Sequence, residues 1–273
     1  MPNHRAGVKV RAVVLMLLTC LVPMLTCLVP MLAWFAYSAS QVQTYWQNCT
    51  EVWAHRGLTV SAEENTISAF DEALKAGARG IEIDVFFDPA QQRFLVKHEP
   101  EPREQELTLE SVFITFGSGT QYWLDFKNLY RLNIDDRNAA LERLVSLADP
   151  NISRRQIVIE SVNERALTTF THQGFNTSYW LNLNDDVSDW QYVVYGVKTH
   201  IKYWLGWFTA VSTDISYYTD RFRIAFFDIP TLLFTVNQPM AIRKIEHPNI
   251  KVVLTDIPIY SQFSHCHQQG GES

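Results

Sequence analysis

The chain is predicted to fold as a closed barrel of parallel strands with helices outside, the (β/α)8 or TIM-barrel class, after an N-terminal transmembrane helix. From residue 51 onward, strand-like runs alternate with segments of helical periodicity, which is the pattern of a parallel sheet. About eight strand units fit into roughly 220 residues, as such a barrel requires. A doubly wound open sheet is the alternative, but no glycine-rich turn follows the first strand.

The first half of the barrel is predicted from hydrophobic runs and their boundaries. Residues 64–77 have apolar positions at helical spacing and end at Gly77, a common helix stop. The turn at Asp88-Pro89 separates two strand-like runs. We expect strands at 52–55, 81–87, 94–98 and 122–127, and helices at 64–77, 108–113 and 139–147.

The same alternation continues in the second half. Residues 190–207 are rich in Trp and Tyr but have no clear period, so no element is assigned to them, and their aromatic side chains either contact lipid or pack in the core. We expect strands at 156–161, 177–183, 210–215, 224–227, 232–236 and 252–256, and a helix at 164–170.

The first 40 residues form a separate segment. Residues 12–37 carry no charge, and this length exceeds the ~20 residues that a helix needs to cross a bilayer. Part of the length comes from a duplication, because L18-T-C-L-V-P-M24 is repeated at residues 25–31. An uncleaved signal-anchor is the preferred interpretation, with a cleaved signal peptide or a buried core helix as alternatives. We therefore expect residues 1–40 as cytoplasmic N-terminus and membrane segment, and 41–273 as the barrel domain.

Charge predicts where the barrel lies and what it avoids. Arg5, Lys9 and Arg11 precede the apolar run, so the positive-inside rule leaves this end in the cytoplasm and exports the rest. The barrel domain is then membrane-anchored in the periplasm or outside the cell, or secreted if the signal is cleaved. Its 20 basic and 29 acidic side chains, from residue 41 onward, leave a net charge of −9. Such a surface repels nucleic acid, so no nucleic-acid partner is expected.

The exported part contains two cysteines, Cys49 and Cys266, one near each end. An oxidising compartment allows them to pair. In a closed barrel the first and last strands are neighbours, so a bridge between these residues would staple the seam. Two free thiols are the alternative.

Four of the predicted strands carry polar residues where an apolar residue would be expected. Catalytic groups in a TIM barrel lie at the carboxyl ends of its strands, and residues two apart on a strand share a face. We therefore expect one rim to collect the polar side chains of these four strands. They are His55, Arg56, Glu82, Asp84, His98, Asp125 and Lys127.

The residue types in this set suit phosphate chemistry. Glu82, Asp84 and Asp125 offer the hard oxygen ligands that Mg²⁺ or Ca²⁺ prefers. Arg56 and Lys127 can hold phosphate oxygens, the arginine through its planar fork.

Two histidines on one rim predict acid–base catalysis. Histidine side chains ordinarily change charge near neutral pH, so one of His55 and His98 can accept a proton while the other donates one. Taken singly, each charged pair also fits a solvated strand face, and each histidine fits a satisfied core position. The conjunction on four strands favours the catalytic interpretation.

The same residues carry a family resemblance. Over most of residues 52–258 the chain resembles the glycerophosphodiester phosphodiesterase family. The resemblance implies a TIM-barrel, metal-dependent phosphodiesterase in which His55 and His98 are the acid–base pair. It also implies that Arg56 and Lys127 bind phosphate, and that Glu82, Asp84 and Asp125 are metal ligands. The motifs that carry it are H55-R-G57, E64-N-T66, A69-F70, G77-A-R-G-I-E-I-D84, V96-K-H98, Y122-W-L-D-F-K127, F234-T-V-N237 and Val253-Leu-Thr-Asp-Ile-Pro258.

Three features depart from the pattern that the family usually shows. The chain has His98-Glu99 where the family has His-Asp, and Asp125-x-Lys127 where it has Glu-x-Lys. Only nine residues separate His98 from Thr108, where the family carries an insertion of several dozen residues. Because that insertion helps to cap the substrate site, we expect a loss of selectivity for glycerol.

The function predicted from these observations is metal-dependent hydrolysis of glycerophosphodiesters or lysophospholipid-type phosphodiesters. The substrate is then a small-molecule or lipid phosphodiester. Two alternatives stay open: a sphingomyelinase D-like lipid phosphodiesterase that gives a cyclic phosphate, and a non-catalytic protein that binds a phosphorylated head group. Trp180 either stacks on that head group or fills the core.

Overall fold

The structure is a computed structural model, and it describes residues 26, 28–30, 33, 46, 49–60, 62–99, 106–149, 151–183, 186–239, 241 and 247–260. Contacts within the chain divide it into two units, Met1–Thr44 and Tyr45–Ser273, and the second contains the barrel. Within the described residues, no helix combines the length and the apolarity that crossing a bilayer requires. The predicted membrane segment lies almost wholly outside the described residues, so it stays a prediction.

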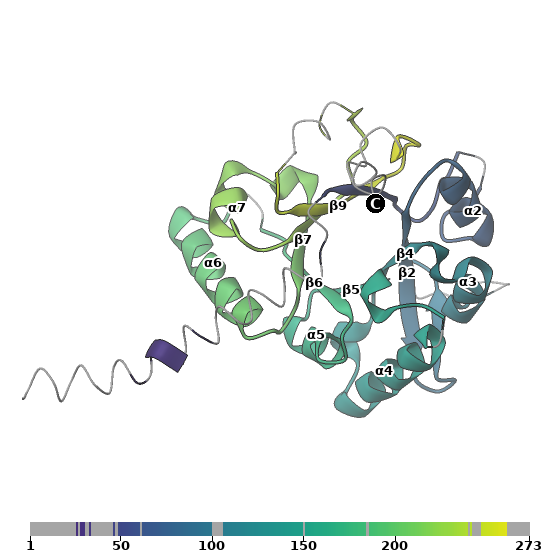
Figure 1. The fold of residues 1–273 in the computed structure, drawn as a ribbon, viewed down its shortest axis with the longest axis horizontal. Coiled ribbons are helices and arrows are strands. Elements are labelled where there is room, and N and C mark those ends of the chain that lie inside the picture. The colour runs from purple at the N-terminus through teal and green to yellow at the C-terminus, as the bar shows by residue number, and fades with distance from the viewer. Residues whose placement is uncertain are drawn as a thin grey trace, which may run out of the picture. The chain divides into compact units, whose positions relative to one another are not determined.

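Eight parallel strands form the closed barrel that the sequence predicts (Figure 1). The ring closes because β1 pairs with β9 on one side and with β2, through Ala54 and Ile81, on the other. The strands are β1 (Glu51–Ala54), β2 (Gly80–Asp88), β4 (Gln121–Phe126), β5 (Ile157–Ser161), β6 (Asn176–Trp180), β7 (Ala210–Asp214), β8 (Thr231–Phe234) and β9 (Ile250–Thr255).

One predicted barrel strand is not part of the ring. β3 (Arg93–Val96) runs antiparallel to the second half of β2. The chain therefore extends past the rim on β2, turns, and comes back on β3 until the amide of Lys97 donates to the carbonyl of Asp84, at 3.0 Å. His98 reaches the rim from this hairpin and not from a barrel strand.

Six helices among the described residues lie outside the ring (Figure 1). Each begins after a side chain that accepts a hydrogen bond from the first turn, as at Thr66, Thr108 and Asn133, and this bond satisfies an amide that the helix itself cannot. The helices are α2 (Ile67–Lys75), α3 (Leu109–Phe116), α4 (Ile134–Ala148), α5 (Glu164–Thr171), α6 (Asp189–Trp204) and α7 (Asp220–Ala225).

Two segments differ from the sequence prediction. Residues 190–207, left without an element, contain most of α6, which starts at a Ser188 capping box. The strand predicted at 224–227 is wrong, because these residues form the end of α7 and the turn after it. Phe222 and Phe226 are both buried, and their rings pack in a tilted arrangement with centroids 4.6 Å apart. Their separation of four residues is the spacing of one helix face.

The barrel interior is filled below the rim by one cluster of apolar side chains that includes Trp53, Trp123, Val158 and Leu232. Gly80 on β2 makes room for the indole of Trp53, because a Cβ at Gly80 would lie 2.3 Å from a ring atom. The smallest residue on β2 is therefore packed against the largest side chain on β1.

Gly80→Ala is expected to destabilise the fold by about 1–3 kcal/mol, the usual cost of overpacking a full core. Urea unfolding followed by circular dichroism measures the change. Gly119→Ala is the matched control, since a Cβ there meets no atom within 4 Å. Equal unfolding midpoints for both variants would show that the Trp53 contact imposes no constraint.

Cys49, just before β1, is disulfide-bonded. Cys266 lies outside the described residues, so its pairing with Cys49 stays a prediction. We expect the unfolded, non-reduced chain from residue 41 onward to show no reactive thiol in a colorimetric titration. Two reactive thiols per chain would exclude the Cys49–Cys266 bridge.

Candidate active site

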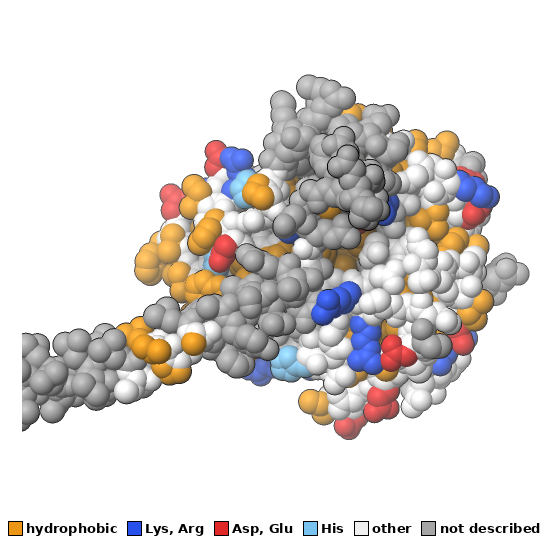
Figure 2. Space-filling view, viewed as in Figure 1, with side chains coloured by type: hydrophobic (Ala, Val, Ile, Leu, Met, Phe, Trp, Pro, Cys, Tyr) orange, Lys and Arg blue, Asp and Glu red, His pale blue; other side chains and the backbone are white. Residues whose placement is uncertain are grey.

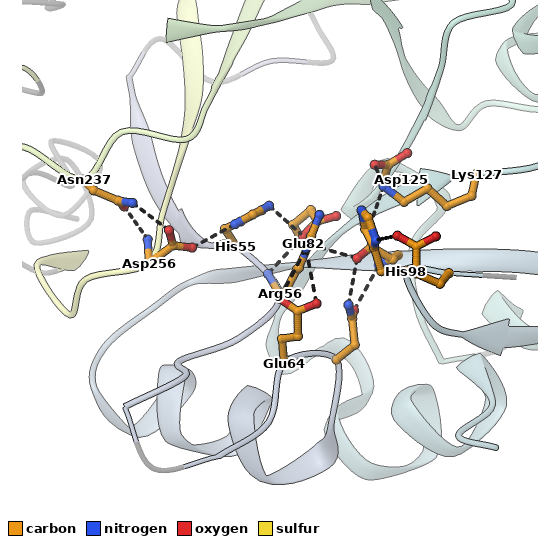
Figure 3. A network of polar contacts seen from close by, with 12 residues as sticks. His55, Arg56, Glu64, Glu82, His98, Asp125, Lys127, Asn237 and Asp256 are labelled. Atoms are coloured by element: carbon orange, nitrogen blue, oxygen red, sulfur yellow. Dashed lines mark hydrogen bonds and ion pairs between the residues drawn. The ribbon is translucent and has the colours of Figure 1, made fainter. Parts of the chain in front are cut away.

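His55, directly after β1, is held by two residues from the end of the barrel (Figure 3). Its Nδ1 is 2.8 Å from Oδ1 of Asp256, which follows β9, and the Nδ2 of Asn237 donates to the other oxygen of Asp256 at 2.6 Å. The free Nε2 of His55 is 4.0 Å from Oε2 of Glu82. Asn237 and Asp256 lie in two of the predicted family motifs, but no role was predicted for either residue.

The ionised state of Asp256 decides which nitrogen of His55 carries the proton. Burial raises the pKa of Asp256, but the hydrogen bonds from His55 and Asn237 outweigh it, so the net pKa is lowered. An ionised carboxylate can only accept a hydrogen bond, so Nδ1 of His55 donates. The neutral ring then presents the lone pair of Nε2 to the site.

Asp256→Asn tests this pair through the pH dependence of stability. Because the folded pKa of Asp256 is lowered, its stabilisation is complete above the unfolded value and is lost as the pH falls through the folded value. The Asp256 side chain is 40% exposed, so we expect the variant to lose less than about 1 kcal/mol at pH 7. Urea unfolding from pH 7 to pH 3 should show this difference shrinking. A difference that grows toward acid pH would contradict the assignment.

Arg56 is fixed by its own backbone and by three carboxylates. It has a φ of +53°, and Gly57 follows with +86°, so the chain turns sharply after β1. Its amide donates to Glu82 at 2.9 Å, its Nε pairs with Asp84 Oδ2 at 2.9 Å, and its Nη1 pairs with Glu64. These contacts aim the guanidinium along the rim.

Asn65 is a site residue that the sequence analysis left without a role, although it lies in the E64-N-T66 motif. It is fully buried with a φ of +58°. Its Nδ2 donates to Asp84 Oδ2 at 2.7 Å, while its Oδ1 accepts from the Asp84 amide at 3.1 Å. Asn65 therefore orients the Asp84 carboxylate. A short polar residue in a motif before a helix is the signal that could have shown it.

Glu82, Asp84 and Asp125 converge as predicted. One oxygen from each lies within 4.8 Å of the other two, and Glu82 and Asp84 are buried. Burial, then repulsion from Asp84 and Asp125, raises the pKa of Glu82 well above its usual range. Burial also raises the pKa of Asp125 despite the attraction of Lys127. The fold holds these acids together against their mutual repulsion. Clusters of acids with raised pKa values are typical of functional sites.

Lys127 lies among these acids. Its Nζ is 2.7 Å from Oδ1 of Asp84 and also pairs with Asp125 Oδ2. Burial lowers the pKa of Lys127, but Asp125 and Asp84 raise it further, so the net pKa is above its ordinary value. Lys127 is thus a permanent cation at the acidic cluster.

His98 lies at the same cavity as His55. Its Nδ1 is 2.7 Å from Oε1 of Glu99, and its Nε2 has no hydrogen-bond partner among the described residues. Figure 3 shows His55 and His98 on either side of Arg56 and Glu82 in that view. Each histidine therefore has a carboxylate at one nitrogen.

Glu160 on β5 is a buried acid that the sequence analysis missed, since it was hidden in the strand Q156-I-V-I-E-S161. It is 3% exposed and lies opposite Asp125 in the β4–β5 register. Burial, then repulsion from Asp125, raises the pKa of Glu160 well above its usual range. A single acidic residue in an otherwise apolar strand was the signal that could have indicated this site residue.

The residues fit a divalent cation. The acidic cluster offers carboxylate oxygens alone, the ligand type of Mg²⁺ and Ca²⁺. Four carboxylates, those of Glu82, Asp84, Asp125 and Glu160, face the two permanent cations Arg56 and Lys127. Because Glu64 also pairs with Arg56, the carboxylates outnumber the two cations when all are ionised, and a divalent cation would offset part of this excess negative charge.

All seven predicted site residues meet at this rim, and six of them line one cavity of about 130 Å³; the seventh, Asp84, lies beside them in the acidic cluster. A larger apolar groove of about 450 Å³ lies between α6 and α7 and contains none of them. Figure 2 shows hydrophobic side chains gathered over these two helices. The groove offers one buried histidine, His200, paired with Asp228 at 2.5 Å. The polar cavity, not the larger groove, has the groups needed for chemistry.

The family comparison agrees with this geometry. Residues 55–86 match the model of the Glycerophosphoryl diester phosphodiesterase family. The predicted family resemblance is confirmed. The matched segment contains His55, Arg56, Glu82 and Asp84, and the family agrees with the predicted enzyme class, a phosphoric diester hydrolase. No curated protein is similar enough in sequence to count as a match.

Solved structures of this family share the fold. A glycerophosphodiester phosphodiesterase from Thermotoga maritima is 19% identical, with a TM-score of 0.56 over 76% of this chain and 94% of that one. One from Parabacteroides distasonis is 17% identical, with a TM-score of 0.57 over 78% and 95%. A phosphodiesterase from Oleispira antarctica in complex with its product sn-glycerol-3-phosphate is 15% identical, with a TM-score of 0.58 over 81% and 97%.

Proposed function

We propose that the chain is a metal-dependent phosphodiesterase that hydrolyses glycerophosphodiesters or lysophospholipid-type phosphodiesters with two histidines as acid and base. The observation that carries the proposal is one cavity lined by two histidines, two permanent cations and acids of the acidic cluster. Among the described residues, neither histidine has a hydrogen-bond partner at Nε2. The Oleispira antarctica neighbour, with sn-glycerol-3-phosphate as its product, supports a glycerol phosphodiester as substrate.

Fixed charges would hold the phosphate between the two histidines. Arg56 is oriented by Asp84 and Glu64, and Lys127 lies at the acidic cluster, so both present positive charge to the cavity. A divalent cation bound by Glu82, Asp84 and Asp125 would supply Lewis-acid stabilisation of the charge on phosphoryl oxygens.

Proton transfer is the work of the histidines. In the scheme that the family resemblance implies, a substrate hydroxyl next to the phosphate attacks phosphorus and gives its proton to Nε2 of one histidine. The bond from phosphorus to the leaving alcohol breaks, and that oxygen takes a proton from Nε2 of the other histidine. Water then opens the cyclic phosphate while the two histidines exchange roles.

Release of free alcohol from soluble diesters tests the function. Purified protein from residue 41 onward is incubated with glycerophosphocholine, glycerophosphoglycerol and lysophosphatidylcholine, with added Mg²⁺ or Ca²⁺ and with chelator. We expect release of alcohol with metal and none with chelator. Binding without release from any of these diesters would favour a head-group binding protein over an enzyme.

The location of the enzyme is a separate proposal. The charge-free run at 12–37 and the basic residues before it support a membrane anchor with the barrel exported. The full chain, with alkaline phosphatase fused after the barrel, is expressed in cells that are then fractionated. We expect phosphatase activity in the membrane fraction. Activity confined to the soluble cytoplasm would contradict the proposal.

A further inference from the structure

The inward face of helix α6 is its more polar face. The buried positions of this helix are Tyr192, Gly196, Thr199, His200 and Tyr203, and none of them is a valine, isoleucine or leucine. A helix on the outside of a barrel normally buries its apolar face and exposes its polar one. On α6 this arrangement is reversed.

The outward face of α6 carries a continuous apolar stripe. We define it as Trp190, Val193, Val197, Ile201 and Leu205, which follow one another at intervals of three or four positions and are 48–73% exposed. At 1.5 Å per residue the stripe is about 22 Å long. None of its residues is charged. Water is an unfavourable environment for such a face, and an exposed apolar patch marks a contact with another apolar surface.

Helix α7 extends the apolar surface across the groove of about 450 Å³. Ile224 on α7 and Phe227 just after it are both exposed. The two helices approach closely because Gly196 has no side chain: a Cβ there would lie 2.9 Å from the carbonyl oxygen of Ala225. The hydrophobic side chains over α6 and α7 in Figure 2 therefore belong to one surface.

The charged side chains that line the groove are paired. Arg221 lies 3.0 Å from Asp189, and His200 lies 2.5 Å from Asp228. These pairs leave little net charge in the groove to attract an acidic or a basic partner. An uncharged hydrocarbon surface therefore fits the groove and the apolar stripe better than a charged macromolecule does.

The composition of α6 matches that of helices that lie in the surface of a bilayer. Such helices combine Trp, Phe or Leu on one face with Lys or Arg beside it. Trp190 lies at one end of the apolar stripe, and Lys198 and Lys202 directly follow two of its residues. In the proposed location a bilayer is also within reach, because residues 38–50, between the predicted anchor and β1, span at most ~45 Å when extended.

We propose that the apolar stripe of α6, together with Ile224 and Phe227, inserts into the surface of a phospholipid bilayer as a membrane contact separate from the predicted anchor. Because α6 follows β6 in a parallel barrel, its first turn lies at the end of the barrel that carries the polar cavity. A bilayer on the stripe thus borders the catalytic rim. The use of this contact for lipid substrates rests on the proposed function, whereas the contact itself does not.

Sedimentation with phosphatidylcholine vesicles tests the contact on the chain from residue 41 onward, which contains the whole closed barrel and lacks the predicted anchor. We expect wild type to pellet with the vesicles. Added 1 M NaCl should not release it, because salt screens charges and not hydrophobic contacts. The double variant Val197→Glu/Ile201→Glu should lower the partition coefficient at least tenfold.

The matched control replaces two exposed isoleucines on other helices. Ile114→Glu/Ile134→Glu makes the same change of charge on α3 and α4, and this variant should bind vesicles as wild type does. Absence of wild-type binding, or equal binding of wild type and both double variants, would overturn the proposal.

Two further measurements separate a bilayer from a second copy of the chain as the occupant. Analytical ultracentrifugation without lipid should show a monomer. A dimer that Val197→Glu/Ile201→Glu dissociates would make the stripe an interface between copies and overturn the proposal. On the full chain bound to phosphatidylcholine nanodiscs, a benzophenone side chain at position 197 should crosslink to lipid at least tenfold more than one at position 142, which is exposed on α4. Equal crosslinking would overturn the proposal, and this arm decides if the glutamate variant fails to fold.

Kinetics on two substrates distinguish failure of the contact from failure of the proposed function. Neither Val197 nor Ile201 lines the polar cavity, so Val197→Glu/Ile201→Glu should leave kcat/KM for soluble glycerophosphocholine unchanged. Cleavage of lysophosphatidylcholine carried in vesicles should fall at least tenfold, and unchanged cleavage there would overturn the proposal. If no diester is cleaved, the proposed function fails, whereas sedimentation and crosslinking still decide the membrane contact.

Discussion

Replacing His55 or His98 with alanine is expected to lower turnover by about 10²–10⁴-fold, the usual contribution of a positioned acid or base. Each side chain presents Nε2 to one cavity while Nδ1 is held by a carboxylate, Asp256 or Glu99. Removing either ring therefore removes one of the two proton transfers.

Initial rates on the best diester measure this effect, and urea unfolding shows whether the fold survives. We expect stability to change by no more than about 1–2 kcal/mol, because both side chains are partly exposed at the rim. His172→Ala is the matched control, since His172 is an exposed histidine at the end of α5. Near-wild-type turnover in either site variant would refute the acid–base assignment.

Removal of divalent metal is expected to abolish activity, and re-addition to restore it. Glu82→Gln, Asp84→Asn and Asp125→Asn should each weaken metal binding at least tenfold, since each removes one of three converging oxygens. Calorimetric titration of Mg²⁺, Ca²⁺ and Mn²⁺ measures the affinity, with the exposed Glu142→Gln on α4 as control. Full turnover in metal-free buffer would remove the metal from the mechanism.

A second readout of the acidic cluster does not depend on activity. Without metal, the buried carboxylates of Glu82, Asp84 and Asp125 repel one another. Glu82→Gln removes one of these charges at nearly constant volume, so the metal-free variant should melt at a higher temperature than metal-free wild type. Saturating metal should reverse the order of the two melting temperatures. Wild type binds the metal more tightly than the variant, so the metal stabilises wild type more.

The alternation of short apolar strands and helices was enough to predict the barrel. Strand boundaries at 52–55 and 122–127 agree with β1 and β4 to within one residue, because inward and outward side chains are both apolar there and the polar residues come at the strand ends. The seven rim residues were predicted for the same reason. A parallel barrel brings all carboxyl strand ends to one side, so position along each strand already indicates position in space.

The sequence patterns did not predict an element whose buried and exposed faces are similarly hydrophobic. On α6 the buried face includes Gly196, Thr199 and His200, while Trp190 and Val193 are exposed, so hydrophobicity has no helical period. The 224–227 run looked like a strand because four residues are too few to separate the two periods. The hairpin of β2 and β3 needed the pairing itself, since sequence does not show to which neighbour a strand bonds.

By itself, the sequence determined the fold class and the chemical nature of the rim, because both depend on residue type and order along one strand. Only the tertiary structure decided the partners. His55 meets Asp256 across 201 positions of chain, Asn65 orients Asp84 from a loop, and Glu160 lies opposite Asp125 in the β4–β5 register. Such contacts arise from barrel closure and strand register, which bring together residues that no local pattern connects.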